Sequence, residues 1–189
     1  MSIVDNLIKE FSSFPGIGRK SAERLAYFLV EPKNSSIAES ITQLLETIST
    51  KLTYCQKCYG FSEQETCSIC SSTGRNPKQL CVVQRPKDIT VMETTGFSGL
   101  YHVLLNERYK ADPTLIELEE KLTTINELII ATDMDAKGDL YTQDILKIAN
   151  KYPTLKTTRL RSGVPLGGFI EFATPDILKN AFKNRVPMK

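Results

Sequence analysis

The fold is decided by the stretch IIATDMDAKGD (residues 129–139), in which an apolar run passes directly into an acidic loop. The apolar run is typical of a buried strand, and an amphipathic segment follows it at residues 140–150. Open α/β sheets place their ligands at the carboxyl ends of parallel strands, which is where this loop would lie. The stretch therefore predicts one strand–loop–helix unit of an α/β sheet.

The same alternation continues on both sides of this unit. Strands are expected at residues 80–83, 100–105, 128–132 and 156–160. Helices are expected at residues 88–95, 115–123, 140–150 and 176–184. Strands that alternate with helices predict a parallel sheet covered by helices.

The first 53 residues are expected to form a helical module. Apolar residues recur at helical spacing before and after the turn sequence FPGIG (residues 14–18). A third helical stripe follows Asn34-Ser35-Ser36, whose side chains are suited to an N-cap.

Two C-x-x-C pairs, CQKC (residues 55–58) and CSIC (residues 67–70), give the sharpest chemical signal. Four thiolates at this spacing predict one structural Zn²⁺ per chain, held by Cys55, Cys58, Cys67 and Cys70. Residues 54–78 are poor in aliphatic side chains, so metal binding would supply their folding energy. A disulfide pair or a redox C-x-x-C is the alternative, and Cys81 is expected to be a buried core thiol.

The turn PGIGRK (residues 15–20) lies between two expected helices. Its glycines allow backbone N–H groups to point outward at a helix N-terminus, where they can hold a phosphate without reading a base. Lys20 and Arg24 lie one helical turn apart and would extend this contact. The predicted DNA-binding residues are Gly16, Ile17, Gly18, Arg19, Lys20 and Arg24; the alternative is a simple turn.

The acidic loop carries a candidate weak Mg²⁺ site formed by Asp133, Asp135 and Asp139. Acidic residues are also common in solvated turns, and this second interpretation stays open. The charge of the chain is otherwise uneven. Its net charge is +2, but residues 147–189 hold nine Lys and Arg against two acids, which suits a polyanion.

Composition excludes several classes of protein. At 189 residues with 41% hydrophobic and 24% charged side chains, the chain is expected to be a globular cytoplasmic protein. Its apolar runs are too short for a membrane span. It has no G-x-x-x-x-G-K-[ST] motif, which argues against an ATPase.

In this order, the hairpin, the cysteine pairs and the strand with its acidic loop resemble the bacterial RecR family of recombination mediators. The resemblance covers nearly the whole chain, including LCVV (residues 80–83), GLYHVL (residues 99–104) and SGVPLGG (residues 162–168). It implies a helix-hairpin-helix module at 1–53, a zinc finger at 54–78, a Toprim domain at 79–172 and a C-terminal helix or tail at 173–189. The last segment would wrap back onto the chain.

The resemblance also implies a function. Members are DNA clamps, built as homodimers or homotetramers, that bind junctions of single- and double-stranded DNA without reading sequence. With RecO and RecF they help load the recombinase RecA onto gapped single-stranded DNA. The expected protein is therefore a non-enzymatic, nucleoid-associated adaptor.

Two departures from the family pattern bear on the rival functions. Gln84 stands where the family usually has Glu, and Lys137-Gly138 stands where it commonly has Glu-Gly. The first rival is a Toprim-type Mg²⁺-dependent nuclease or topoisomerase fragment, and Gln84 argues against it because an amide is not a general base. The second is a zinc-stabilised scaffold that binds only proteins, against which Lys20, Arg24 and the basic C-terminal block argue.

Overall fold

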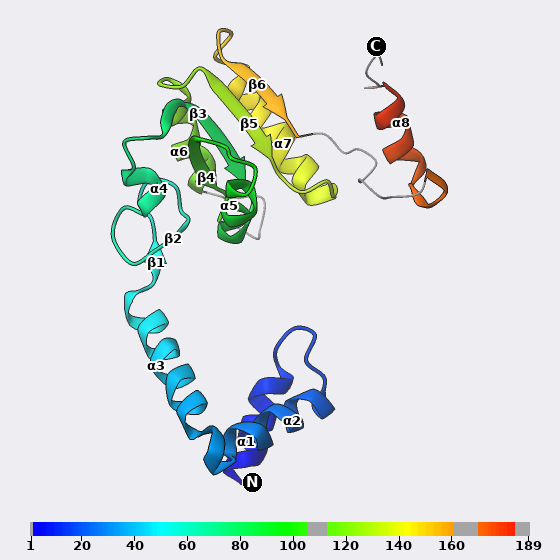
Figure 1. The fold of residues 1–189 in the computed structure, drawn as a ribbon. Coiled ribbons are helices and arrows are strands. Elements are labelled where there is room, and N and C mark those ends of the chain that lie inside the picture. Colours follow the sequence, from blue (N-terminus) through cyan, green and yellow to red (C-terminus); the bar gives the residue numbers. More distant parts are fainter. Residues whose placement is uncertain (1, 106–112, 161–169, 184–189) are drawn as a thin grey trace. The chain divides into compact units, whose positions relative to one another are not determined.

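The computed structural model describes residues 2–105, 113–160 and 170–183, except the side chains of residues 172 and 180 (Figure 1). The chain divides into two compact units, Met1–Leu52 and Thr53–Lys189. The mixed α/β class predicted from the sequence is confirmed. Within the described residues, no helix combines the length and the apolar character that a membrane span requires.

The N-terminal unit is helical, as expected. Its elements are α1 (Ile3–Ser12), α2 (Arg19–Val30), the short 3-10 helix η1 (Pro32–Asn34) and α3 (Ser35–Lys51). A capping box starts α1, because Ser2 Oγ accepts from the Asp5 N–H and Asp5 Oδ2 accepts from the Ser2 N–H. Asn34 is the N-cap residue of α3, within the expected segment, but its side chain makes no capping hydrogen bond and donates to the Phe28 carbonyl at 2.7 Å.

The second unit begins with a small cysteine-containing subdomain. Strands β1 (Thr53–Tyr54) and β2 (Phe61–Ser62) form an antiparallel pair, and the one-turn helix α4 (Ser68–Ser71) follows. Cys55 and Cys58 lie in the turn between the two strands, and Cys67 and Cys70 lie at the start of α4 and within it. The two cysteine pairs are therefore held by two different local structures.

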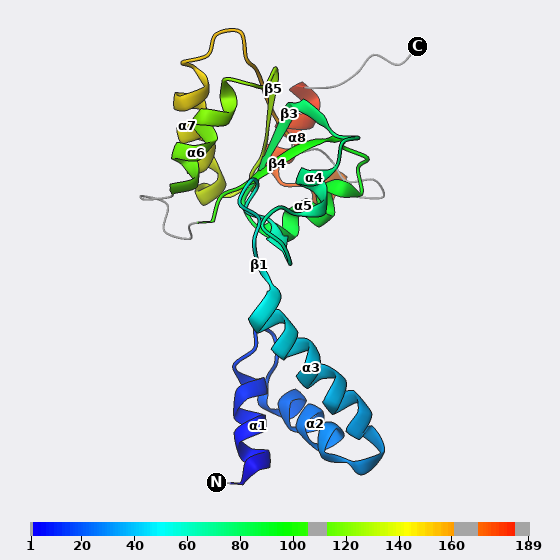
Figure 2. The ribbon, with the colours of Figure 1, turned by 90° about the vertical axis from the view of Figure 1, so that its left-hand side faces the viewer.

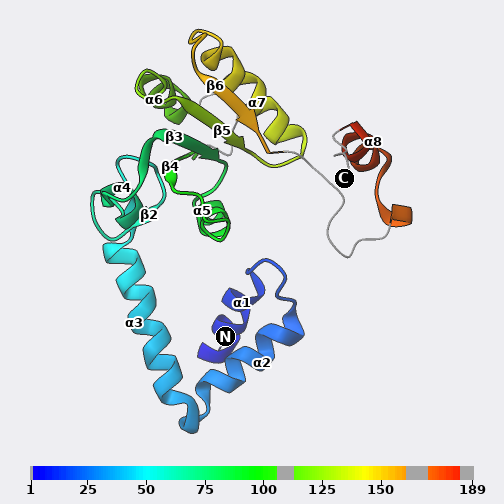
Figure 3. The ribbon, with the colours of Figure 1, turned by 45° about the horizontal axis from the view of Figure 1, so that its top comes forward.

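A four-stranded parallel sheet follows, in the order β4-β3-β5-β6. Its strands are β3 (Asn76–Val83), β4 (Gly99–Val103), β5 (Glu127–Ala131) and β6 (Lys156–Arg159). The connecting helices are α5 (Pro86–Glu93), α6 (Pro113–Leu122) and α7 (Ala136–Ala149), and the chain ends with η3 (Ile170–Phe172) and α8 (Pro175–Lys183). Strand β4 is the edge nearest the cysteine-containing subdomain, and β6 is the opposite edge (Figure 3).

The two faces of the sheet are covered differently, because successive side chains of a strand point to opposite faces. Leu80 and Val82 of β3 pack with residues of α6 and α7, among them Leu118 and Ile145. Cys81 and Val83 pack in a second cluster, which contains α5 and the cysteine-containing subdomain. Figure 2 shows α6 and α7 on one side of the sheet and α4 and α5 on the other.

Candidate functional site

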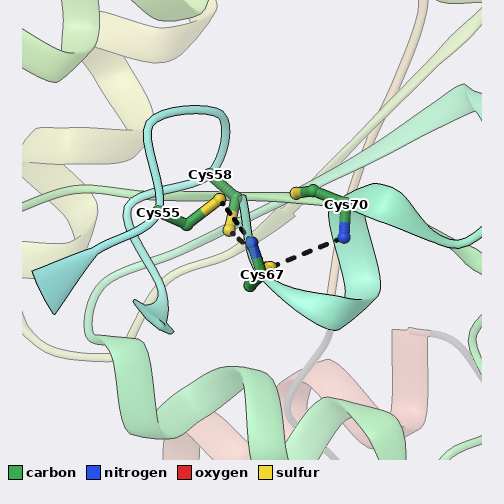
Figure 4. Close-up of side chains that lie close together, drawn as sticks. All are labelled: Cys55, Cys58, Cys67 and Cys70. Atoms are coloured by element: carbon green, nitrogen blue, oxygen red, sulfur yellow. Dashed lines mark hydrogen bonds between the residues drawn. The ribbon is translucent and has the colours of Figure 1, made fainter. Parts of the chain in front are cut away.

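The four cysteines converge on one point. Their Sγ atoms all lie within 4.8 Å of one another, and those of Cys58 and Cys67 are 3.6 Å apart (Figure 4). Sulfurs at about 2.3 Å from a tetrahedral zinc are about 3.8 Å from each other, so these residues fit one Zn²⁺. Within the residues described above, no other group of three or more metal-ligating side chains meets the same distance limit.

Backbone amides prepare the cysteine sulfurs for metal binding. The Sγ of Cys55 accepts from the N–H groups of Lys57 and Cys67 at 3.4 and 3.3 Å, and the Sγ of Cys58 accepts from that of Gly60 at 3.3 Å. Donors of this kind favour thiolates over thiols. A hydrogen bond from Cys70, aided by the Gly60 amide and opposed by burial, lowers the pKa of Cys58 to about 5.

The turn between the first two cysteines and β2 depends on its sequence. Tyr59 adopts a left-handed conformation with a φ of 62°, and Gly60 follows it. A Cβ on Gly60 would lie 2.8 Å from Ile89 Cδ1 and 3.3 Å from Cys58 Sγ. A side chain at this position would therefore displace either the Ile89 side chain in the core or the sulfur of Cys58.

All five cysteines are free thiols, so the alternative of a disulfide finds no support. Cys81 is fully buried, as expected, and burial raises its pKa to about 12. It points into the core cluster rather than joining the four-sulfur group.

The structure separates the roles of the two hairpin glycines. Gly16 has a φ of 80°, a conformation that glycine adopts without strain. Gly18 has a φ of −78° as the N-cap of α2, and a Cβ there would meet nothing within 4 Å. The turn itself thus requires Gly16 and not Gly18.

The cations around the hairpin are not equivalent. Arg19 forms an exposed ion pair with Glu23 at 3.2 Å. Lys20 and Arg24 are exposed and line one open groove on α2. Gly18 supplies no side-chain cap, so the first amides of α2 remain open to an acceptor from outside the helix.

The three carboxylates of the acidic loop interact with other groups of the same chain. Asp133 pairs with Arg85 at 2.9 Å, and Asp139 pairs with Arg159 at 2.7 Å. Asp135 is the N-cap of α7, and its Oδ1 accepts from the Gly138 N–H at 2.7 Å. Mg²⁺ binding here stays a prediction.

The Gln84 side chain links the residue after β3 to the acidic loop that follows β5. It is 9% exposed, and its Oε1 accepts from the Asp133 N–H at 2.7 Å. Gln84, Asp133 and Asp135 line one pocket of about 320 Å³, to which Arg85 and Lys137 also contribute. The carboxylates therefore share the pocket with two cations.

His102 of β4 forms a contact with Lys121 of α6. His102 is fully buried, and burial, reinforced by Lys121, lowers its pKa to about 3. Its Nε2 is 2.8 Å from the Thr114 carbonyl, and its Nδ1 is 2.8 Å from Lys121 Nζ. The sequence analysis missed Lys121, because only the three-dimensional structure brings it to His102.

Comparisons with known families divide the chain in the same order as its motifs. Residues 4–48 match the helix-hairpin-helix family of RecR, residues 52–72 match the four-cysteine zinc finger domain of RecR, and residues 78–161 match the Toprim domain. The cysteine cluster is thus a four-cysteine zinc finger by both family and geometry.

Curated relatives match nearly the whole chain. A protein named "Recombination protein RecR" from Saccharopolyspora erythraea is 36% identical over 191 residues, with 96% of each chain covered. Proteins of the same name from Paenarthrobacter aurescens and Rhodopirellula baltica are 37% and 36% identical, with 96% of this chain and 95% of theirs covered.

Proposed function

The chain belongs to the RecR family of recombination proteins, and from this membership we propose that it is a DNA-binding clamp and adaptor in recombinational DNA repair. In this role it helps load RecA onto gapped single-stranded DNA together with RecO and RecF. It binds junctions of single- and double-stranded DNA without reading sequence and works in the cytoplasm at the nucleoid. The same proposal divides the chain into a helix-hairpin-helix module at residues 1–53, a zinc finger at 54–78, a Toprim domain at 79–172 and a C-terminal helix or tail at 173–189.

The observation that carries the proposal is the glycine hairpin. Open amides at the start of α2 and the exposed cations Lys20 and Arg24 offer a phosphate both hydrogen bonds and charge. Lys156 and Arg159 are weaker candidates, since they pair with Glu127 and Asp139. We therefore assign the main DNA contact to the hairpin.

Self-association is the second part of the proposal. Helix α3 has no buried residue in the structure, although one of its faces is apolar. The exposed side chains of that face include Ile37, Ile41, Leu44, Leu45 and Ile48. A large exposed apolar face favours an interface, here one that forms a homodimer or homotetramer able to encircle DNA.

Replacing Lys20 and Arg24 together by Ala is expected to weaken binding to all DNA sequences, roughly tenfold at moderate salt. The slope of log affinity against log salt should flatten by about one unit for each lost contact. Fluorescence anisotropy with labelled DNA over a range of salt concentrations measures both quantities.

The charge-matched control is Lys51→Ala/Lys87→Ala, since both lysines are exposed and lie outside the hairpin. It should keep the affinity and slope of the wild type, and sedimentation should show that both double variants remain assembled. If Lys20→Ala/Arg24→Ala binds DNA as the wild type does, the hairpin is not the DNA contact. Failure of the intact oligomer to bind any DNA would favour the protein-only scaffold.

No cleavage, religation or relaxation of DNA is expected in the presence of Mg²⁺. Gln84 supplies no carboxylate, and Arg85 holds Asp133 in an ion pair. The measurement is agarose electrophoresis of supercoiled plasmid incubated with the protein and Mg²⁺. Nicking that disappears in Asp133→Asn would replace the clamp proposal with the Toprim-type enzyme.

A further inference from the structure

The first cysteine pair of the zinc finger lies along the edge strand of the sheet. The Val103 N–H of β4 donates to the Cys58 carbonyl at 2.9 Å. The Cys58 side chain packs in the cluster on one face of the sheet. Tyr59 packs against the same cluster and also contacts His102, whose strand partner Val82 packs on the opposite face. This segment therefore reaches around the edge of the sheet toward α6.

Lys121 of α6 meets the segment there. Its Nζ donates to the Lys57 carbonyl at 2.6 Å and to His102 Nδ1 at 2.8 Å, and it lies 5.6 Å from the centre of the Tyr59 ring. The carbonyl and the ring are uncharged groups that attract a cation. Helix α6 is thereby attached to the residues between and after Cys55 and Cys58.

His102 accepts from Lys121 because of its other contact. The Thr114 carbonyl can only accept a hydrogen bond, so His102 Nε2 must carry the proton and donate to it. In the neutral ring Nδ1 is then the acceptor, which the lysine ammonium can use. Among the described residues, the Lys121 ammonium thus donates to one acceptor in the zinc finger and one in β4.

A partly buried ammonium group needs its hydrogen bonds satisfied. Burial lowers the pKa of Lys121, and Glu117 on its own helix is the first of the charged groups that oppose this shift. Glu117 is engaged in addition, since it accepts a hydrogen bond from the Tyr59 hydroxyl. Two contacts therefore join α6 to the first cysteine pair: Lys121 with the Lys57 carbonyl, and Glu117 with the Tyr59 hydroxyl.

We propose that Lys121 braces the first cysteine pair of the zinc finger and that, through the Lys57 carbonyl and His102, it couples metal binding to the attachment of α6. The Lys57 carbonyl lies between two zinc ligands, Cys55 and Cys58, so the contact that fixes it also helps to fix the positions of their sulfurs. Zinc affinity and the position of α6 are therefore linked, with Lys121 as a positioning residue.

Lys121→Met tests the link, because Met keeps the length and apolar character of the side chain and removes its charge. Zinc affinity should fall about 10- to 100-fold, the usual effect of losing a residue that supports metal ligands. Competition with a chromogenic chelator measures the affinity. The charge-transfer bands of the Co²⁺-substituted protein report whether four thiolates still coordinate.

Two further variants separate charge from packing. Lys121→Arg restores the charge and should recover most of the lost affinity. Lys147→Met removes an exposed lysine of α7, which pairs only with Asp144 among its described contacts, and should bind zinc as the wild type does. An affinity of Lys121→Met within twofold of the wild type would overturn the proposal, as would an equal loss in Lys147→Met.

His102→Phe carries the test if Lys121→Met does not fold. It keeps an aromatic ring in the core but removes the acceptor that holds Lys121 beside the zinc finger. Zinc affinity should fall several-fold, and chelator-driven release should become faster. Unchanged affinity and release in a folded His102→Phe protein would exclude the coupling.

Discussion

Replacing Cys58 by Ser is expected to abolish stoichiometric zinc binding and to lower the free energy of unfolding of the Thr53–Lys189 unit by about 3 kcal/mol or more. Serine provides no thiolate, so a closed four-sulfur site becomes a three-sulfur site. Metal analysis gives the stoichiometry. Urea unfolding followed by tyrosine fluorescence gives the stability, since six of the seven tyrosines belong to this unit.

The expected loss is large because Cys58 serves the core as well as the metal. It is fully buried in one cluster with Ile89, Tyr101 and Val103, and its carbonyl accepts from the edge strand. A serine hydroxyl in this cluster would be a buried polar group beside three unsatisfied thiolates. The damage should therefore extend from the zinc finger into the sheet.

Cys81→Ala is the matched control. Cys81 lies fully buried in the same cluster but outside the zinc site. Its replacement should cost only packing, about 1 kcal/mol, and should leave one zinc per chain. A folded wild-type protein with no metal and four reactive thiols would contradict the zinc assignment, as would a Cys58→Ser variant with full zinc content.

The sequence predicts those features whose signals are local. The alternation of strand-like and amphipathic segments places all four strands of the sheet, and the C-x-x-C pairs identify a zinc site because four ligands lie within 16 residues. The first residues of the helices and strands are predicted less accurately. Strand β3 begins at Asn76, four residues before the apolar run at residues 80–83, because the polar Gln79 still pairs with Glu127.

Helix α7 shows the same limit. The sequence predicts it from residue 140, but it begins at Ala136, immediately after the N-cap Asp135. Gly138 lies in its first turn, and glycine disfavours helices, so the amphipathic pattern becomes visible only later. The sequence analysis instead assigns the capping carboxylate to a candidate metal site, because capping and metal binding use the same residue types.

Contacts between residues far apart in the sequence cannot be predicted from its patterns. Arg85 and Asp133 are 48 residues apart, and no spacing rule relates them. The histidine–lysine pair is 19 residues apart on a strand and a helix, and only the packing of α6 against the sheet brings the two together. One of these contacts engages a carboxylate of the acidic loop, and the other belongs to the attachment of α6 to the zinc finger.

Gly138→Ala is expected to lower the free energy of unfolding by about 3 kcal/mol, because it forces backbone apart at the acidic loop. A Cβ on Gly138 would lie 2.0 Å from the Asp133 carbonyl oxygen and 2.8 Å from its carbonyl carbon. Neither atom belongs to a flexible side chain, so the strand end or the helix must move. The Gly138 carbonyl also accepts from the Thr142 hydroxyl at 2.8 Å.

The same movement would disturb the residues that Gly138 positions. Its N–H donates to Asp135, and the Asp133 carbonyl that it contacts belongs to the residue paired with Arg85. Gly74→Ala is the matched control, since a Cβ there has its nearest neighbour at 3.8 Å, an ordinary contact. Its stability should stay within about 0.5 kcal/mol of the wild type. Equal stability of the two variants in urea unfolding would show that the β5–α7 junction accommodates a side chain, and that the close approach of Gly138 to Asp133 does not fix the geometry of the acidic loop.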